Sequence, residues 1–253
     1  MMIKAPLESK VVLVTGATRG IGAAIVTALH GDGAQIIGHF GHNKDDANTL
    51  LANFPERLDL LQANLMDNHA IESLWIKALA IYGRIDVLVN NAGIYVESPI
   101  GDESDWIKGW ENNIQVNLQA PANLCRLAIQ HFQAQDGGVI INMASRSSHR
   151  GDGPEHLAYG AAKGGLLALT KGIARGYAHD KILSYAIAPG WVRTAMAENH
   201  IKSVGEEYIN AALPMREITP PTDVANMVAF CASGKCRHAT GSTIDITGAD
   251  YVR

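Results

Sequence analysis

The sequence predicts an α/β fold: a doubly wound, mostly parallel sheet with helices on both faces, in three layers ordered α/β/α. Short apolar runs rich in β-branched residues alternate with helix-length segments, which is the rhythm of parallel strands joined by helices. These runs are continuously apolar rather than alternating, as expected of strands buried on both faces. With 253 residues and neither a repeat nor a linker, the chain is predicted to form one domain, residues 1–253.

Strand candidates follow one another along the chain at residues 10–14, 35–39, 58–63, 85–89, 138–143, 182–187 and 243–246. Helical patterns fill the gaps at residues 21–31, 44–53, 67–82, 106–118, 121–135, 159–178 and 221–233. Segment 190–215 breaks this rhythm, because it follows a strand, opens after Pro189 and ends near Pro214. Ligands of α/β proteins bind beside such long connections at the carboxyl ends of strands, so we predict a substrate lid here. The alternative is an ordinary surface excursion.

The composition argues against several classes of function. The formal net charge is −4 and the basic residues do not cluster, so we expect no nucleic-acid and no anionic-membrane partner. No apolar stretch approaches the roughly 20 residues that span a bilayer. The N-terminal MMIKAPLESK lacks the apolar core of a signal peptide, so we expect a cytoplasmic protein. Three cysteines without the Cys/His spacing of a zinc site predict neither a disulfide framework nor a metal centre.

A glycine-rich turn follows the first predicted strand and opens the first helix. It reads Thr15-Gly16-Ala17-Thr18-Arg19-Gly20-Ile21-Gly22. Glycines let the backbone turn sharply and approach a pyrophosphate closely, and a helix N-terminus offers free N–H groups with a partial positive charge. The spacing is G-x-x-x-G-x-G rather than G-x-G-x-x-G. Its place between a strand and a helix predicts a dinucleotide-binding turn.

The end of the second predicted strand bears on the choice of cofactor. NAD-binding sites usually place a carboxylate there to hold the ribose 2′-OH, but residues 36–44 read IIGHFGHNK. A 2′-phosphate would meet no repulsion, and Arg19 could neutralise it with help from His42 or Lys44. We therefore predict NADP(H) in preference to NAD(H). The alternative for Arg19 is a solvated turn residue that contacts no phosphate.

A tyrosine and a lysine near the start of one predicted helix indicate acid/base chemistry. Tyr159 and Lys163 are four residues apart, so their side chains share one helix face. A free tyrosine has a pKa of about 10, and a nearby ammonium favours the phenolate and lowers that pKa. Ser145 follows the buried strand at 138–143, where its hydroxyl could polarise a substrate oxygen. Each residue alone would be typical of a helix surface or a turn cap.

In their order along the chain these motifs resemble the short-chain dehydrogenase/reductase family, in its single-domain branch with 3-oxoacyl-carrier-protein reductase-like members. The resemblance is carried by the glycine turn, Asn90-Asn91-Ala92-Gly93, Ser145, Tyr159-x-x-x-Lys163 and Pro189-Gly190, and it covers nearly the whole chain. It implies a Rossmann fold. It also implies an NAD(P)-dependent oxidoreductase that transfers a hydride between the nicotinamide and an alcohol/carbonyl substrate.

The resemblance implies roles for individual residues. Tyr159 would exchange the proton, Ser145 would steady the substrate oxygen, and Lys163 would hold the nicotinamide ribose. Asn117 would kink its helix and hold a water of a proton relay. The implied cofactor-binding residues are Thr15, Gly16, Thr18, Arg19, Gly20, Ile21, Gly22, Asn64, Leu65, Asn91, Ala92, Gly93, Tyr159, Lys163, Pro189, Gly190, Val192 and Thr194. Asn64 stands where many members have Asp, a mild departure because Asn still forms hydrogen bonds.

The sequence says little about the substrate. The polar segment 146–158 and Glu97 should border the pocket, which predicts a small polar, sugar-like carbonyl compound. The alternatives are a solvated rim and a 3-oxoacyl thioester. Against the thioester, segments 133–137 and 178–180 lack the basic residues that an acidic carrier would need. A non-catalytic NADP-binding regulator is a further alternative, which the presence of all four catalytic residues disfavours.

The family resemblance also implies a homo-oligomer, a dimer or a homotetramer. Residues 118–132 and 164–173 carry apolar and small residues beyond what one core face needs, although buried crossover helices would look the same. The closing residues 250–253 are expected either to reach a neighbouring subunit or to fray.

Overall fold

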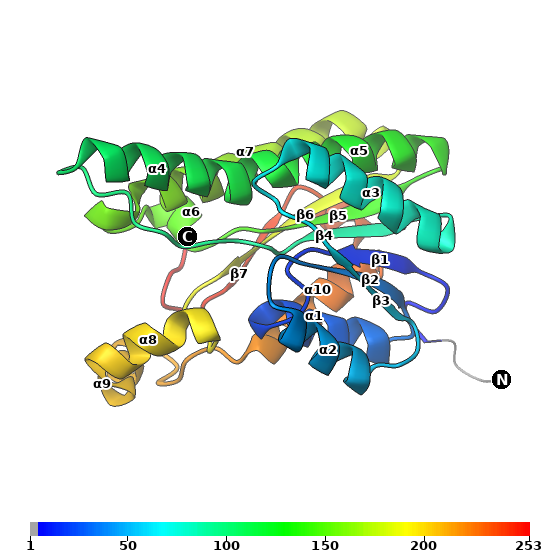
Figure 1. Cartoon of the computed structure of the whole chain (residues 1–253). Helices are drawn as coiled ribbons and strands as arrows, with labels where there is room; N and C mark the ends of the chain where they lie inside the picture. Colours follow the sequence, from blue (N-terminus) through cyan, green and yellow to red (C-terminus); the bar gives the residue numbers. More distant parts are fainter. Residues whose placement is uncertain (1–4) are drawn as a thin grey trace.

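The computed structural model describes residues 5–253, apart from the side chains of Met196, Asn199 and His200. Within that range one seven-stranded sheet has the order β3-β2-β1-β4-β5-β6-β7, and each neighbouring pair is parallel (Figure 1). The strands are β1 (Val11–Val14), β2 (Gln35–Phe40), β3 (Leu58–Gln62), β4 (Val87–Asn90), β5 (Gly138–Met143), β6 (Ile182–Pro189) and β7 (Thr243–Ile246). The predicted parallel sheet is confirmed, with strand ends shifted by no more than two residues.

Helices cover both faces of the sheet, so the predicted three layers are confirmed (Figure 1). One face carries α1 (Gly20–Gly31), α2 (Lys44–Asn53) and α10 (Pro221–Ala232). The other carries α3 (Asn68–Tyr82), α4 (Glu103–Ile114), α5 (Ala120–Ala134) and α7 (Leu157–Tyr177). Shorter elements are α6 (Ser147–Arg150) and the 3₁₀ turns Pro154–His156, Ala178–Asp180 and Arg237–Ala239.

Two apolar cores, one on each side of the sheet, explain why the strands read as continuous apolar runs. In β1, Val12 and Val14 pack toward α1 and α10, whereas Val11 and Leu13 pack toward α3 and α5. Successive side chains of a strand point to opposite faces, so a strand covered on both faces must be apolar at every position.

The two helices predicted at 106–118 and 121–135 form one continuous helical run instead of two separate helices. α4 continues through a π-helical turn, Gln115–Gln119, directly into α5. Pro121 explains the irregular turn, because it has no N–H to give the carbonyl of Asn117 an α-helical hydrogen bond. Single π-turns inside α-helices are frequent at functional sites.

Segment 190–215 folds into two short helices that the sequence did not predict, α8 (Ala195–Val204) and α9 (Glu206–Ala212). They pack on a small apolar cluster of their own, formed by Ile201, Ile209, Leu213 and Ile218.

Among residues 5–253, no helix combines the length and the apolar character needed to cross a membrane.

Candidate active site

The glycine turn connects the carboxyl end of β1 with α1, and it adopts a backbone that only glycine fits easily. Gly16 and Gly20 have φ values of +63° and +53°, in the left-handed region that side chains disfavour. A Cβ on Gly22 would lie 1.9 Å from the carbonyl oxygen of Gly16, and one on Gly16 would lie 2.9 Å from Cα of Ala92. The turn is therefore closed against itself and against the end of β4.

Thr15 and Asn91 fasten this turn to the end of β4. The Thr15 hydroxyl accepts hydrogen bonds from the backbone N–H groups of Asn91 and Ala92, both at 3.0 Å. The Asn91 amide donates to the carbonyl oxygens of Thr15 and Gly16 at 2.9 and 3.0 Å. The predicted residues Asn91 and Ala92 thus support the turn from beneath.

The first turn of α1 leaves its N–H groups without a side-chain cap. An uncapped helix start with a partial positive charge is suited to an anion such as a pyrophosphate. Thr18 and Ile21 are partly exposed on this turn, and Arg19 is exposed. The Arg19 guanidinium forms no hydrogen bond or ion pair with other residues in the described part of the chain, so its charge is available.

At the end of β2, the predicted position of a ribose-binding carboxylate is occupied by Phe40 and Gly41. The carbonyl of Gly41 accepts a hydrogen bond from the Gln62 side chain at 2.8 Å. His42 and Lys44 are exposed beyond it, at the start of α2. No acidic side chain stands between β2 and α2 in the described structure, which agrees with the sequence.

Asn64 and Leu65 follow β3 on the same edge of the sheet. Asn64 is exposed, and its side-chain oxygen accepts the backbone N–H of Met66 at 3.0 Å. The Leu65 side chain is buried, and its carbonyl accepts a hydrogen bond from the Gln115 side chain at 3.1 Å. Asn64 therefore keeps its side-chain N–H groups for another partner.

Ser145, Tyr159 and Lys163 come together at the carboxyl end of β5. Ser145 lies just after the strand, while Tyr159 and Lys163 lie in the first turns of α7. The Ser145 hydroxyl is close enough to the Tyr159 hydroxyl to lower its pKa. The Lys163 ammonium lies 5.8 Å from the centre of the Tyr159 ring and donates to the carbonyl of Met143 at 2.7 Å. That bond fixes α7 against β5.

Burial controls the protonation of this group. It raises the pKa of Tyr159 to about 12, an effect that outweighs the influence of the Ser145 hydroxyl and the Arg146 charge, which both lower that pKa. Burial also lowers the pKa of Lys163 to about 8. We predicted a lowered pKa for Tyr159, and the net direction is the opposite because removal from water disfavours the phenolate. At neutral pH Tyr159 is a phenol.

Asn117 lies in the π-helical turn, fully buried beneath the site. Its side chain exchanges two hydrogen bonds with the backbone of Ile94, at 3.0 and 2.9 Å. A Cβ on Gly93 would lie 2.9 Å from the Asn117 side-chain oxygen and 3.5 Å from the Lys163 nitrogen. Gly93 is therefore the position at which Asn117 and Lys163 approach each other.

The segment after β6 closes the site from the other side. Gly190 lies against Thr247, since a Cβ there would be 3.1 Å from the Cα of Thr247, and Val192 pairs with Thr219. A Cβ on Gly20 would lie 3.2 Å from a methyl carbon of Thr194. The predicted segments 16–22 and 189–194, distant in sequence, therefore meet over the start of α1.

Several residues at this site were not among the predicted site residues. The Tyr95 ring stacks on His156 with centres 3.7 Å apart and meets Tyr159 edge-on at 4.8 Å. Its hydroxyl donates to Asp152 at 3.3 Å. Polarity of segment 146–158 was the available signal for Asp152 and His156, whereas nothing in the sequence marked Tyr95.

Glu97, expected at the pocket, is exposed near α4, where its carbonyl faces Gly109.

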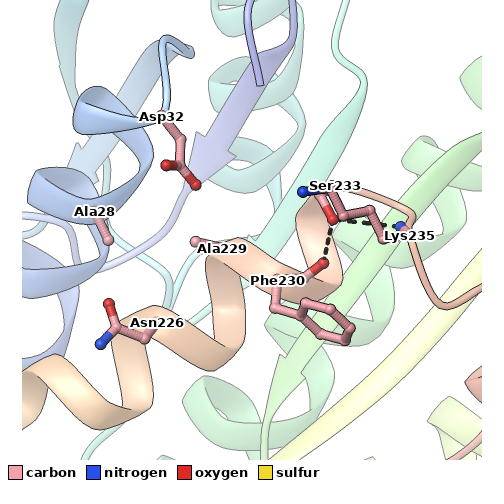
Figure 2. A pocket seen from close by; sticks show the side chains of 7 residues that line it. All are labelled: Ala28, Asp32, Asn226, Ala229, Phe230, Ser233 and Lys235. Atoms are coloured by element: carbon pink, nitrogen blue, oxygen red, sulfur yellow. Dashed lines mark hydrogen bonds between the residues drawn. The ribbon is translucent and has the colours of Figure 1, made fainter. Parts of the chain in front are cut away.

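A second surface feature lies away from these residues. Figure 2 shows a hollow between α1 and α10, lined by Ala28, Asp32, Asn226, Ala229, Phe230, Ser233 and Lys235. Because α1 begins at the glycine turn and Ala28 and Asp32 lie at its far end, this hollow shares no residue with the candidate active site. No cluster of three or more His, Cys, Asp or Glu side chains suited to a metal ion occurs in the described region.

Comparisons with known proteins agree with this geometry. Residues 10–204 match the family model described as short chain dehydrogenase. Nodulation protein G of Rhizobium sp. (strain N33) is 35% identical, with 96% of this chain and 97% of the relative covered. The 3-oxoacyl-[acyl-carrier-protein] reductase of Staphylococcus aureus (strain MW2) is 32% identical, with 96% and 99% covered.

A relative and a solved structure carry other names. 3beta-hydroxysteroid dehydrogenase 1 of Eggerthella lenta is 34% identical, with 96% of this chain and 94% of the relative covered. A Brucella melitensis crystal structure described as a short-chain dehydrogenase/reductase, glucose/ribitol dehydrogenase, superposes with a TM-score of 0.88 at 27% identity, covering 99% of this chain and 100% of that one. The chain therefore belongs to the short-chain dehydrogenase/reductase family of NAD(P)-dependent oxidoreductases.

Proposed function

We propose that this protein interconverts a small polar carbonyl compound and its alcohol with NADP(H), using Tyr159 as the general acid/base. The observation that carries the proposal is the convergence of three side chains. The Lys163 ammonium lies 5.8 Å from the centre of the Tyr159 ring, and the Ser145 hydroxyl is close enough to lower the Tyr159 pKa. A phenol, a hydroxyl and an ammonium meet at the carboxyl edge of the sheet, which is where α/β proteins bind their ligands.

The residues present fit a nicotinamide dinucleotide. The tight backbone at Gly16 and Gly22 and the uncapped start of α1 suit a pyrophosphate. Arg19 offers an unpaired guanidinium beside them, and no carboxylate at the end of β2 would repel a 2′-phosphate. Lys163, Pro189, Gly190, Val192 and Thr194 would hold the nicotinamide end. When bound, the cofactor supplies or accepts the hydride.

The protein residues handle the proton and the oxygen. In reduction, the Tyr159 phenol donates its proton to the substrate oxygen, and a pKa of about 12 keeps that proton in place at neutral pH until charge develops. Ser145 donates a hydrogen bond to the same oxygen as its negative charge grows. The Lys163 ammonium then stabilises the phenolate, because opposite charges attract strongly where water is excluded. Asn117 holds the backbone at Ile94 in place beside them.

The polar wall beside Tyr159 favours a hydroxylated substrate. Tyr95, Asp152 and His156 offer hydroxyl, carboxylate and imidazole groups where an acyl chain would need apolar contacts. The glucose/ribitol description of the Brucella structure points the same way. A 3-oxoacyl thioester is the second candidate, favoured by the full-length likeness to the Staphylococcus reductase. No feature of the described site supports a non-catalytic regulator.

We further propose that segment 190–215 is a substrate lid. α8 and α9 pack on their own apolar cluster rather than on the two cores of the sheet, so they can move together at little cost to those cores.

The protein is also proposed to form a homo-oligomer. Ile107 and Trp110 on α4 are 47% and 37% exposed, which leaves apolar surface that a second copy could cover.

An absorbance assay at the reduced-nicotinamide band tests the proposal, with NADPH and NADH across sugars, polyols, keto esters and steroids. We expect Tyr159→Phe to lower kcat by roughly 10²–10⁴-fold, the usual contribution of a positioned acid. Tyr177→Phe, at the far end of the same helix, is the matched control and should keep full activity. Undiminished turnover in Tyr159→Phe would contradict the proposed role of Tyr159. A wild-type protein that binds NADPH but reduces none of these compounds would contradict the proposal that it is an enzyme.

A further inference from the structure

An arginine with a largely buried guanidinium directly follows Ser145. The Arg146 side chain is 12% exposed, although arginine is rarely buried without a partner. Its backbone N–H donates to the carbonyl of Pro189 at 3.0 Å. Arg146 therefore sits between the ends of β5 and β6, close enough to Tyr95, Asp152 and Tyr159 for their charges to act on it.

The Arg146 guanidinium is held in place, but not all of its N–H donors have a partner. One of its faces lies over the Trp191 ring, 5.3 Å from the ring centre. One of its nitrogen atoms forms an ion pair with Asp250. A guanidinium has five N–H donors, and no other acceptor for them occurs among the residues that the structure describes. Its remaining donors are left for a partner that comes from outside the chain.

The charges around Arg146 leave it with one direct counter-ion. Asp152 is also near, but it already accepts hydrogen bonds from the Ser147 hydroxyl at 2.6 Å, the Gly153 N–H at 2.9 Å and the Tyr95 hydroxyl. Burial, and after it the positive charge of Arg150, lowers the pKa of Arg146 to about 10. Arg146 is still a cation at neutral pH, and Asp250 is its direct partner.

Asp250 belongs to the C-terminal turn rather than to the body of the fold. The two residues before it, Gly248 and Ala249, have φ values of +59° and +64°, and a left-handed backbone at alanine is strained. The backbone N–H of Asp250 donates to the Thr247 carbonyl at 3.2 Å, and Tyr251 stacks on His149. The Thr247 hydroxyl also donates to the Tyr251 carbonyl at 3.1 Å, and Arg253 forms an ion pair with Asp245 at 2.9 Å, so the turn itself is well held. Among the described residues the Asp250 carboxylate has Arg146 as its one ion-pair partner, so this side chain can rotate away while the turn stays in place.

We propose that Arg146 recognises a carboxylate on the substrate, and that the Asp250 carboxylate occupies this position until the substrate replaces it. This inference rests on the proposed function and narrows it to oxo acids and hydroxy acids, including sugar acids. The planar guanidinium matches a planar carboxylate through two parallel hydrogen bonds. The negative charge of Asp152 stays beside Arg146 and repels a second negative charge on the ligand. The site therefore suits a carboxylate with one negative charge better than a dianionic phosphate.

The inference predicts a preference that paired substrates measure directly. The pairs are 3-oxobutanoate with its methyl ester, 2-oxobutanoate with its methyl ester, and glucuronate with glucose. We expect the wild-type protein to show a higher kcat/KM for the acids. In Arg146→Gln that acid-to-neutral ratio should fall at least tenfold through KM for the acids, while the pH profile of kcat keeps its shape.

Two variants separate recognition from structure. Asp250→Asn removes the competing carboxylate and should lower KM for the acids several-fold without changing KM for the esters. Arg150→Gln removes the same charge from an exposed position in the same loop and should change the ratio less than twofold. The double variant Arg146→Gln, Asp250→Asn leaves no unpaired buried charge, so it shows whether a loss in the single variant reflects misfolding.

A binding measurement keeps the test independent of turnover. Butanoate, which carries one carboxylate, should raise the Tm of the wild-type protein with NADPH present and should leave that of Arg146→Gln unchanged. The inference is overturned if butanoate shifts neither Tm, if the wild-type protein prefers the esters, or if Arg146→Gln changes acids and esters equally. The proposed function would survive each of these outcomes if the protein still reduced neutral carbonyl compounds and if that reduction required Tyr159.

Discussion

His39 accepts a hydrogen bond on its Nδ1 atom from the backbone N–H of Gly16, at 3.2 Å, and thereby ties β2 to the glycine turn. Its other nitrogen, Nε2, lies 3.1 Å from the carbonyl oxygen of Ala63. A carbonyl only accepts, so the proton of the neutral ring is on Nε2. Burial lowers the pKa of His39, which keeps this neutral form.

Protonation of His39 should weaken the fold as the pH falls. Its folded pKa lies below the unfolded value of 6.5, so the stability it contributes is present above pH 6.5 and is lost as the pH falls through the folded pKa. We expect Tm to drop between pH 6.5 and 5, and to drop less in His39→Asn. That variant should also lose about 1–2 kcal/mol at pH 8, because the Ala63 carbonyl loses its donor.

Thermal melts from pH 5 to 8 measure both effects. His69→Gln is the control, since His69 is exposed on α3 and should not alter the pH dependence. An identical pH dependence in the wild-type protein and in His39→Asn would show that His39 does not titrate in this range.

Features set by neighbouring residues were predictable from the sequence. The strand Val11–Val14 could be predicted because its apolar run is local, and Tyr159 and Lys163 because helix geometry alone puts residues four apart on one face. The turn's need for glycine also follows from its own short sequence. In these cases the physical cause lies within a few residues of its effect.

Contacts that depend on the position of several strands were not predictable. His39 reads as one more strand residue, and its bond to Gly16 exists only because β1 and β2 are neighbours. The ion pair of Arg146 with Asp250 needs the C-terminal turn to lie beside the end of β5. Burial likewise decides the pKa of Tyr159, and the local presence of Lys163 suggested the wrong direction.

Gly22→Ala should abolish cofactor binding. The new Cβ would lie 1.9 Å from the Gly16 carbonyl oxygen, so the turn would have to open. Gly31→Ala, at the other end of α1, meets no atom within 4 Å and should keep binding while gaining roughly 0.5–1 kcal/mol of stability from helix propensity. Fluorescence titration with NADPH and thermal melts compare the two, and equal affinities would contradict the role of the turn.

Arg19→Ala should distinguish the two cofactors. A hydrogen-bonded charge pair contributes about 1.5–3 kcal/mol, so KM for NADPH should rise roughly 10- to 100-fold. KM for NADH should change less than twofold, because NADH has no 2′-phosphate. Lys44→Ala, an exposed position on α2, should have a smaller effect on NADPH. An equal rise for both cofactors would place Arg19 on the pyrophosphate instead.

Lys163 should set the alkaline limit of activity. Burial lowers its pKa to about 8, and the mechanism needs the ammonium, so kcat/KM should fall as the pH rises through about 8. The pKa of Tyr159, about 12, is too high to cause that fall. Lys163→Arg keeps its charge and should lose the alkaline limb, whereas Lys163→Met should lose activity by at least about 10²-fold at every pH. A profile from pH 6 to 10 that is unchanged in Lys163→Arg argues for another group.

Pro121→Ala should raise the stability of the protein and lower its activity. The new N–H can donate to the Asn117 carbonyl, which favours a regular α-helix over the π-helical turn Gln115–Gln119. We expect a higher Tm, because proline inside a helical run costs up to about 3 kcal/mol. A regular helix would turn Asn117 away from Ile94 and change the contact of Gly93 with Lys163, so kcat should fall about tenfold or more. Pro221→Ala, at the start of α10, replaces a proline that needs no N–H there and should change neither property much. A higher Tm with undiminished kcat would show that the π-helical turn is not needed for catalysis.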